Sequence, residues 1–281
     1  MDIRTQQEKA AAFRGLHDGS RILILPNAWD VASARIFEAA GFRAIGTTSC
    51  GVAWALGYPD GERMSREEML GVVRRIASRV TLPVTADMEA GFARTPEGVA
   101  ETARGVIAAG AVGINLEDGT HDPERPLTDV SLQVEMIRAA RQAASSAGVP
   151  LVINARTDAV WSGSGEADAR LDVAVRRANA YRAAGADCLF VFGVRDPQAI
   201  ARLVREIDGP LNVIAGPGVP AIPALAQLGV ARVSVGGGPM RATLTLLRRI
   251  ADELRGPGAY TTFLQDTISY SELNALLEAG L

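Results

Sequence analysis

The chain of 281 residues lacks the features that mark several classes of protein. Its two cysteines, Cys50 and Cys188, have no Cys-x-x-Cys spacing, so we expect reduced, buried side chains rather than a disulfide or a zinc site. No apolar run approaches the roughly 18 residues that a membrane span requires. The N-terminal sequence MDIRTQQEKAAAFRGL has neither the apolar core nor the cleavage pattern of a signal peptide. A net charge of −3 offers no basic surface for nucleic acid or an anionic membrane. These absences indicate a cytoplasmic protein of enzyme size, without a nucleic-acid or membrane partner.

What the sequence does contain is a repeated unit, in which short β-rich runs alternate with longer segments of helical period. Many helical segments open on Ser, Thr or Asp and close on Gly, as capped helices do. The tetrapeptides AAGF, AAGA, SAGV, AAGA and QLGV recur just before the next strand. Eight strands, each followed by a helix, in roughly 250 residues predict a (β/α)8 (TIM) barrel, an α/β fold. The predicted strands are residues 21–27, 44–49, 83–91, 112–119, 151–158, 188–193, 211–218 and 232–238.

A doubly wound open sheet is the main competing fold. The first strand is not followed by Gly-x-Gly-x-x-Gly, however, and eight evenly spaced units favour closure into a barrel. We predict a single barrel domain over residues 1–281, of which residues 256–281 are a C-terminal helical appendage. Such an appendage is expected to pack on the barrel rim or on a neighbouring subunit.

Polar side chains gather at the ends of three consecutive predicted strands. Active sites of such barrels lie at the carboxyl ends of the strands, and residues two apart in a strand share a face. By this alternation the third strand presents Asp87 and Glu89 to the barrel interior. The fourth strand presents Glu117, and the fifth presents Arg156 and Asp158.

Four acids against one arginine leave an excess of negative charge at this end of the barrel. A salt-bridge network around Arg156 that only stabilises the barrel is the structural alternative, and it does not account for the excess. Mg²⁺ does, because it prefers oxygen ligands from one or two carboxylates, several waters and a bound substrate. Mn²⁺ suits the same ligands. The sequence therefore predicts a Mg²⁺ site at Asp87, Glu89 and Glu117, with Mn²⁺ as an alternative ion.

Two further stretches point to the same rim. The sequence GTTSCG, residues 46–51, has small residues whose N–H and hydroxyl groups suit a carboxylate, although a plain strand-to-loop turn would look similar. Asp60 lies in a Pro/Gly loop over the mouth, where a lone Asp is often solvated or turn-forming. The substrate-binding candidates are Thr48, Ser49, Cys50, Asn154 and Asp158.

Several motifs in order carry a resemblance to a known family. They are LPNAWDVASARIFEAAGF, GYPDG, DMEAGF, LED and ARTDA. On these motifs the chain resembles the isocitrate lyase/phosphoenolpyruvate mutase superfamily over nearly its whole length. The resemblance implies a (β/α)8 barrel that forms homodimers or homotetramers by exchanging a C-terminal helix. It also implies Mg²⁺-dependent cleavage or formation of C–C or P–C bonds in 2-oxo or 2-hydroxy acids, through an enolate-like intermediate.

The resemblance also implies roles for individual residues. Asp87 would contact the metal directly, while Glu89 and Glu117 would hold its waters. Asp60 would stand near substrate and metal. Arg156 would pair with the substrate carboxylate or a developing oxyanion, and the backbone at Thr48 to Cys50 would cradle that carboxylate.

The loop after the fourth strand departs from the family. Lyases of the family carry a Lys-Lys/Arg-Cys-Gly-His segment there, whereas this chain has EDGTHDPERPLTD, without Cys or Lys. An isocitrate or methylisocitrate lyase is therefore not expected. Phe192 stands near the position of a glutamate in lyases, which favours a small substrate. His121, in the shortened loop, is either a surface histidine without a role or the general acid/base of the site.

The leading hypothesis is a Mg²⁺-dependent lyase or decarboxylase that acts on a small 2-oxo or 2-hydroxy acid, such as oxaloacetate. A phosphonopyruvate hydrolase or mutase is the second hypothesis, and here only a short loop is available to bind the phosphoryl group. The third is a non-catalytic protein that binds a 2-oxo acid. Pyruvate release, phosphorus NMR and calorimetry distinguish the three.

Overall fold

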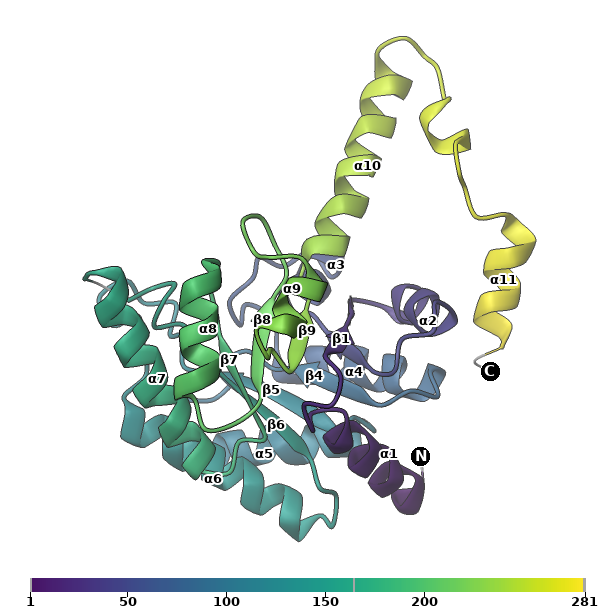
Figure 1. The fold of residues 1–281 in the computed structure, drawn as a ribbon. Coiled ribbons are helices and arrows are strands. Elements are labelled where there is room, and N and C mark those ends of the chain that lie inside the picture. The colour runs from purple at the N-terminus through teal and green to yellow at the C-terminus, as the bar shows by residue number, and fades with distance from the viewer. Residues whose placement is uncertain (1, 164, 280–281) are drawn as a thin grey trace.

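The sheet closes into the barrel that the sequence predicts (Figure 1). The computed structural model describes residues 2–163 and 165–279. All strands are parallel, in the order β1-β9-β8-β7-β6-β5-β4-β3-β2. Pro26 has no N–H group and divides the first strand, so β1 pairs with β9 while β2 pairs with β3. The strands are β1 (Leu23–Leu25), β2 (Asn27–Ala28), β3 (Ile45–Thr47), β4 (Val84–Asp87), β5 (Gly113–Glu117), β6 (Val152–Thr157), β7 (Cys188–Val191), β8 (Leu211–Ile214) and β9 (Arg232–Ser234).

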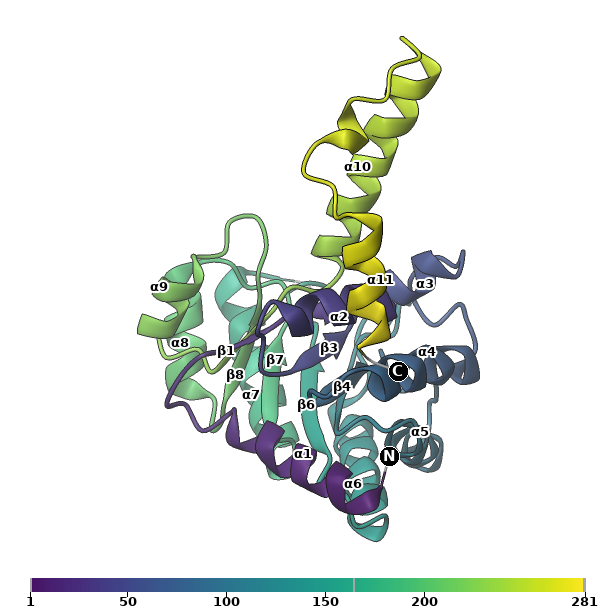
Figure 2. The ribbon, with the colours of Figure 1, turned by 90° about the vertical axis from the view of Figure 1, so that its right-hand side faces the viewer.

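Helices surround the sheet, and several begin at the capping residues that the sequence shows (Figures 1 and 2). Ser65 and Asp30 form capping boxes, and Thr95 accepts a hydrogen bond from the third residue of its helix. The helices are α1 (Ile3–Gly15), α2 (Val31–Ala39), α3 (Ser49–Ala55), α4 (Arg66–Arg79), α5 (Pro96–Ala108), α6 (Val130–Ser146), α7 (Ala167–Ala183), α8 (Pro197–Glu206), α9 (Ile222–Gln227), α10 (Gly238–Arg255), the short 3₁₀ turn η1 (Thr262–Leu264) and α11 (Tyr270–Glu278).

The recurring glycine before each strand ends a helix. This glycine adopts a positive φ in all five tetrapeptides, which a residue with a Cβ rarely does. Each helix can therefore stop and its chain turn back toward the sheet within a few residues. The five positions are Gly41, Gly110, Gly148, Gly185 and Gly229.

Helix α1 covers the amino-terminal end of the barrel (Figure 2). Phe13 is fully buried and packs so closely on β5 that a Cβ at Gly113 would lie 2.8 Å from its ring. Gln6 donates from Nε2 to the carbonyls of Ile107 and Ala111, at 2.8 and 3.0 Å. Burial of the helix thus closes the end of the barrel opposite to the strands' carboxyl ends.

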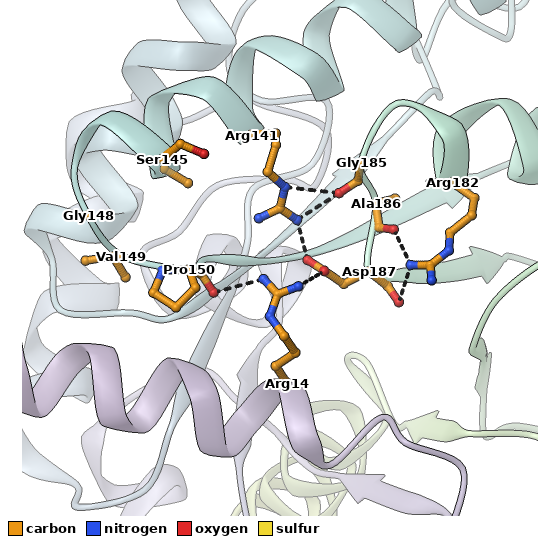
Figure 3. Close-up of a pocket in the computed structure, with 11 residues that line it drawn as sticks. Arg14, Arg141, Ser145, Gly148, Val149, Pro150, Arg182, Gly185, Ala186 and Asp187 are labelled. Carbon is orange, nitrogen blue, oxygen red and sulfur yellow. Dashed lines mark hydrogen bonds and ion pairs between the residues drawn. The ribbon is translucent and has the colours of Figure 1, made fainter.

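A cluster of charged side chains lies beside α1, which we call the amino-end cluster (Figure 3). Its arginines donate to carbonyl groups at the ends of helices and strands. Arg141 bonds to the carbonyl of Gly185 at 2.8 Å, and Arg182 to that of Ala186 at 2.8 Å. Asp187 forms ion pairs with Arg14 and Arg141 and accepts a hydrogen bond from the Ile153 N–H at 2.8 Å. The amino-end cluster comprises Arg14, Arg141, Arg182 and Asp187.

The C-terminal part of the chain leaves the barrel. Helix α10 projects outward from the rim in both views, and α11 returns to lie against α2 (Figures 1 and 2). Arg35 on α2 donates to the carbonyl of Leu276 at 2.9 Å. Met240 is the one buried side chain of α10, whereas several of its leucines are exposed. Over the described residues, none of the helices combines the length and apolarity needed to cross a membrane.

Candidate active site

A cavity of about 680 Å³ opens at the carboxyl ends of the strands. Three strands and three loops contribute polar side chains to its walls: Asp60, Asp87, Asn115, His121, Arg156 and Asp158. Trp161, Phe190 and Phe192 line one side. The cavity thus lies at the end of the barrel where the sequence predicts the site. We refer to the carboxylates around this cavity, Asp60, Asp87, Glu89, Glu117 and Asp158, as the acid cluster.

Asp87 is held firmly by both of its carboxylate oxygens. Its Oδ2 accepts hydrogen bonds from the N–H and the hydroxyl of Ser49, at 2.9 and 2.8 Å. Its Oδ1 accepts a longer bond from Asn115 Nδ2, at 3.4 Å. The Asp87 N–H in turn donates to the Thr47 hydroxyl at 2.8 Å. The Asp87 carboxylate is therefore held in a fixed orientation, as a metal ligand needs to be.

Glu89 lies at the site, but it is not part of the strand that strand alternation predicts. Strand β4 ends at Asp87, because its pairing with β5 ends with Asp87 opposite Asn115. Glu89 then adopts a left-handed backbone with φ of 49°, which is rare for a residue with a side chain. Its Oε2 accepts a hydrogen bond from the Glu62 N–H at 2.9 Å, while its buried Oε1 has no partner among the described residues. Burial raises the pKa of Glu89.

Glu117 and Arg156 form the buried ion pair of the site. Glu117 Oε2 lies 2.8 Å from Arg156 Nη1. Burial raises the pKa of Glu117 well above its usual range, against the opposing effect of Arg156. Burial also lowers the pKa of Arg156, but the carboxylates of Glu117 and Asp158 raise it overall, so the guanidinium stays charged.

Arg156 is fixed in position from three sides. Its Nε and Nη2 donate to the two oxygens of Asp158, at 2.6 and 2.8 Å. Its guanidinium also lies 4.0 Å from the centroid of the Phe192 ring, in cation–π contact. Phe192 in turn meets Trp161 edge to face. The result is a rigid cation beside an aromatic wall.

His121 lies among the acids rather than free on the surface. Its Nε2 is 3.7 Å from Glu89 Oε2 and 3.7 Å from Glu117 Oε1. The Glu89 carboxylate raises the pKa of His121 against the effect of partial desolvation. His121 therefore lies within reach of two carboxylates of the acid cluster.

The residues present fit a divalent cation. One ligand atom each from Glu89, Glu117 and His121 lies within 4.8 Å of the others. The unpartnered Oε1 of Glu89 is a buried acceptor that a cation would satisfy. Carboxylate oxygens are the ligands that Mg²⁺ and Mn²⁺ prefer. Asp87 is near enough for its carboxylate to raise the pKa of Glu89 and of Glu117, but it is not part of that three-residue group.

The remaining predicted residues take different positions. Thr48, Ser49 and Cys50 line the cavity, but both donors of Ser49 are directed at Asp87. Burial raises the pKa of the Cys50 thiol to about 11, so this group stays protonated. Asp60 lines the mouth, and desolvation and the charge of Asp87 raise its pKa.

Asn154 departs from its predicted role. It is fully buried below the cavity, and its Nδ2 donates to Asn115 Oδ1 at 2.9 Å. A side chain without exposed surface supports the site from below and does not contact a substrate. The error arises because Asn154 shares a strand face with Arg156 but lies one layer deeper in the barrel.

The sequence reasoning missed Asp118, which follows Glu117. Asp118 is fully buried and points away from the cavity, where its Oδ2 accepts from Tyr181 at 2.7 Å and from Arg177 at 3.0 Å. Its Oδ1 accepts from the Asp158 N–H at 2.9 Å, so it positions the strand end that carries Asp158. The available signal was Arg177 and Tyr181, four residues apart on one face of α7.

The fold and the acid-lined cavity are those of a (β/α)8-barrel protein whose site lies at the carboxyl ends of the strands. Residues 13–255 match the phosphoenolpyruvate phosphomutase family, and the chain belongs to this family. The resemblance inferred from the sequence motifs is therefore confirmed.

Individual relatives are similar over almost the whole chain. The uncharacterized protein Rv1998c of Mycobacterium tuberculosis (strain ATCC 25618 / H37Rv) is 35% identical over 266 residues, 95% of this chain and 96% of its own. A crystal structure from Burkholderia cenocepacia J2315 is 39% identical and superposes with a TM-score of 0.90, covering 97% of this chain and 96% of that one.

Two similar structures contain oxalate. Oxaloacetate acetylhydrolase in complex with the product oxalate is 26% identical, with a TM-score of 0.84 and coverage of 97% of this chain and 94% of that one. Phosphonopyruvate hydrolase in complex with oxalate and Mg²⁺ is 28% identical, with a TM-score of 0.84 and coverage of 95% and 94%. Two of these similar proteins are thus named as enzymes, one for oxaloacetate and one for phosphonopyruvate.

Proposed function

We propose that this protein is a Mg²⁺-dependent carbon–carbon lyase or decarboxylase that acts on a small 2-oxo or 2-hydroxy acid. The charge distribution of the cavity is the observation that supports this most directly. Five carboxylates surround one fixed arginine and one half-exposed histidine, and one buried carboxylate oxygen of Glu89 is without a partner among the described residues. This arrangement attracts a cation first and, with the cation, an anionic substrate.

Asp87, Glu89 and Glu117 would hold the ion. When bound, Mg²⁺ would neutralise the negative charge that grows on the 2-oxo oxygen as the adjacent bond breaks. Because Mg²⁺ prefers oxygen ligands, this assignment leaves His121 free for proton transfer. Oxalate, found with Mg²⁺ in the similar phosphonopyruvate hydrolase structure, resembles the enolate of pyruvate in shape and charge.

Arg156 orients the substrate carboxylate. Asp158 and Glu117 use three of the five N–H donors of the guanidinium, which leaves one donor on Nη1 and one on Nη2 for a carboxylate in the cavity. Since Asp158 and Phe192 already fix the side chain, little reorganisation accompanies binding. Thr48 and Cys50 line the far side and complete the proposed substrate site with Asp60.

His121 supplies the proton that the product carbon needs. Its Nε2 lies beside Glu89 and Glu117, and the Glu89 carboxylate raises the pKa of His121, which suits a proton donor. Cleavage of oxaloacetate, for example, would break the C–C bond to the distal carboxylate and release carbon dioxide. The electron pair moves to the 2-oxo oxygen, and the proton then returns to carbon to give pyruvate. The aromatic wall of Trp161, Phe190 and Phe192 limits the substrate size.

Hydrolysis or rearrangement of phosphonopyruvate is the second candidate. The similarity to phosphonopyruvate hydrolase favours it, while the short loop around His121 offers few groups for a phosphoryl group. A non-catalytic 2-oxo acid binding protein is the third candidate.

Purified protein with Mg²⁺ should be offered a panel of acids, including oxaloacetate, 2-hydroxy acids with a longer chain, and phosphonopyruvate. We expect pyruvate or another 2-oxo acid to form from a C–C substrate and to stop when EDTA removes the metal. Phosphate release from phosphonopyruvate, followed by phosphorus NMR, would instead assign P–C chemistry. Saturable oxalate binding by calorimetry without turnover of any acid would assign a binding protein.

We also propose that the chain forms a homodimer or homotetramer in which the C-terminal helical segment is exchanged. Helix α10 projects from the rim and exposes Leu244, Leu247 and Leu254, an apolar face that a second copy could cover. Light scattering should give a mass at least twice 29.5 kDa. Leu247→Arg should shift the mass toward the monomer.

A further inference from the structure

One charged side chain lies inside the barrel itself, below the cavity. Arg232, at the start of β9, is the largest fully buried side chain of the described residues. It shares a strand face with Ser234, two residues on, which lines the cavity. Arginine stays protonated in proteins, so a full positive charge lies in the barrel core.

Arg232 has few partners for a buried charge. Its Nη2 donates to Asn115 Oδ1 at 3.4 Å, and its Nε and Nη1 have no partner among the described residues. No carboxylate of the described residues lies within 4.0 Å of its guanidinium. Burial lowers the pKa of Arg232, and Cys188 and the Asp87 carboxylate partly offset that effect. Its stabilising counter-charge is therefore in the acid cluster above it rather than in a direct ion pair.

The contact with Asn115 determines how that amide is oriented. Asn115 Oδ1 accepts from both Arg232 Nη2 and Asn154 Nδ2. Since Arg232 has donors only, an inverted amide would place the Asn115 NH₂ group against two other donors. The oxygen must therefore face downward, and the NH₂ group must face upward, where it meets Asp87 Oδ1 at 3.4 Å.

We propose that Arg232 is a positioning residue for the metal site, because it orients Asn115, which in turn holds the Asp87 carboxylate toward the ion. The inference rests on the metal site of the proposed function, but not on which acid is the substrate. Ser49 fixes one oxygen of Asp87 from the rim, and Arg232, through Asn115, fixes the other from inside the barrel. Groups that orient a ligand in this way typically change metal affinity by about 10- to 100-fold when they are removed.

The experiment measures Mn²⁺ binding to full-length protein by calorimetry, with thermal unfolding of each metal-free variant alongside. Arg232→Met and Asn115→Leu should each weaken Mn²⁺ binding by about 10- to 100-fold. The double variant should bind no more weakly than the weaker single variant, since both changes interrupt one chain of contacts. Arg232→Gln replaces Arg232→Met if the latter does not fold.

Arg141→Met is the matched control, because Arg141 belongs to the amino-end cluster and is bonded to Asp187 and Gly185. It should lower the melting temperature and leave Mn²⁺ affinity within about twofold. Wild-type affinity in a folded Arg232 variant, additive losses in the double variant, or failure of both Arg232 variants to fold would each overturn the proposal. So would a wild-type protein that binds no Mn²⁺.

Turnover of the panel of acids is measured in a separate assay from Mn²⁺ binding. Protein that binds Mn²⁺, loses affinity on Arg232→Met and turns over no acid would support this inference and not the proposed function. Protein that releases pyruvate while Arg232→Met keeps its Mn²⁺ affinity would support the function and not the inference.

Discussion

The two ends of the barrel carry charged clusters that differ in how their charges are compensated. In the amino-end cluster, the arginine donors end on backbone carbonyls, and Asp187 is shared by Arg14 and Arg141 (Figure 3). In the acid cluster, carboxylates outnumber cations, and Glu89 keeps a buried oxygen without a partner among the described residues. Polar groups that are bonded within the protein stabilise a fold, whereas a buried polar atom without a partner is one that a ligand can satisfy. We therefore expect the function at the carboxyl end, as in other barrels of this type.

The largest expected effect follows from neutralising a carboxylate in the acid cluster. Asp87→Asn keeps the shape of the side chain but removes the charge that Ser49 and Asn115 orient. We expect kcat/KM for the substrate found in the panel to fall roughly 1,000-fold, a loss typical of a removed electrostatic contact in an active site. Rates of product formation at saturating Mg²⁺ measure it. A decrease of less than about tenfold would mean that Asp87 does not contribute to the reaction.

The same carboxylate-to-amide change in the amino-end cluster should lower stability and leave activity unchanged. Asp187→Asn leaves Arg14 and Arg141 without their shared carboxylate, and removing one partner of such a pair costs about 3 kcal/mol. In a chain of this length that lowers the melting temperature by about 5 °C. Thermal unfolding and activity per folded molecule, at 25 °C, check this result. A loss of activity without a loss of stability would contradict the comparison of the two ends.

The two histidines extend the comparison to pH. His17 lies at the amino end, just after α1, and burial lowers its pKa to about 4, whereas Glu89 raises the pKa of His121 at the carboxyl end. The unfolded chain protonates His17 near its ordinary value, so the stability it provides above that pH is lost as the pH falls toward 4. At pH 5 the loss is about 2 kcal/mol.

His17→Gln, which stays neutral, should lack this part of the acid destabilisation. Urea unfolding at pH 7.5 and pH 5 gives the difference between wild type and variant, so that the carboxylates common to both cancel. Equal acid destabilisation of the two proteins would show that His17 is protonated in the folded state at pH 5.

The sequence predicts the barrel well because its signals are local. Strand and helix periods, capping residues and the five glycines with positive φ all act within a few residues of each other. The sequence also predicts the end of the barrel at which the acids gather, because that end follows from the direction of the strands.

The parts of the site that the sequence does not reveal depend on distant pairs. Ser49 and Asp87 are 38 positions apart, so nothing local shows that the donors of Ser49 are used by Asp87 rather than by a substrate. Arg232 at a strand start is indistinguishable from an exposed residue until the register places it inside the barrel. Glu89 entered the site through a left-handed turn, which strand alternation does not anticipate.

Asp118 lies at the carboxyl end of the barrel but is bonded in the same way as the acid of the amino-end cluster. It lies at the carboxyl end, yet its oxygens are fully engaged by Tyr181, Arg177 and the Asp158 N–H, as those of Asp187 are engaged by arginines. Tyr181→Phe removes one of these bonds and leaves the other two, so we expect a loss of about 1 kcal/mol in the free energy of unfolding. Activity should stay within about twofold, because Arg156 keeps both of its bonds to Asp158. Urea unfolding and steady-state rates measure the two quantities. The contrary outcome is that Tyr181→Phe lowers kcat more than about tenfold at unchanged stability. In that case an acid whose oxygens are all bonded within the protein would still be functional, and the comparison of the two ends would fail at the carboxyl end.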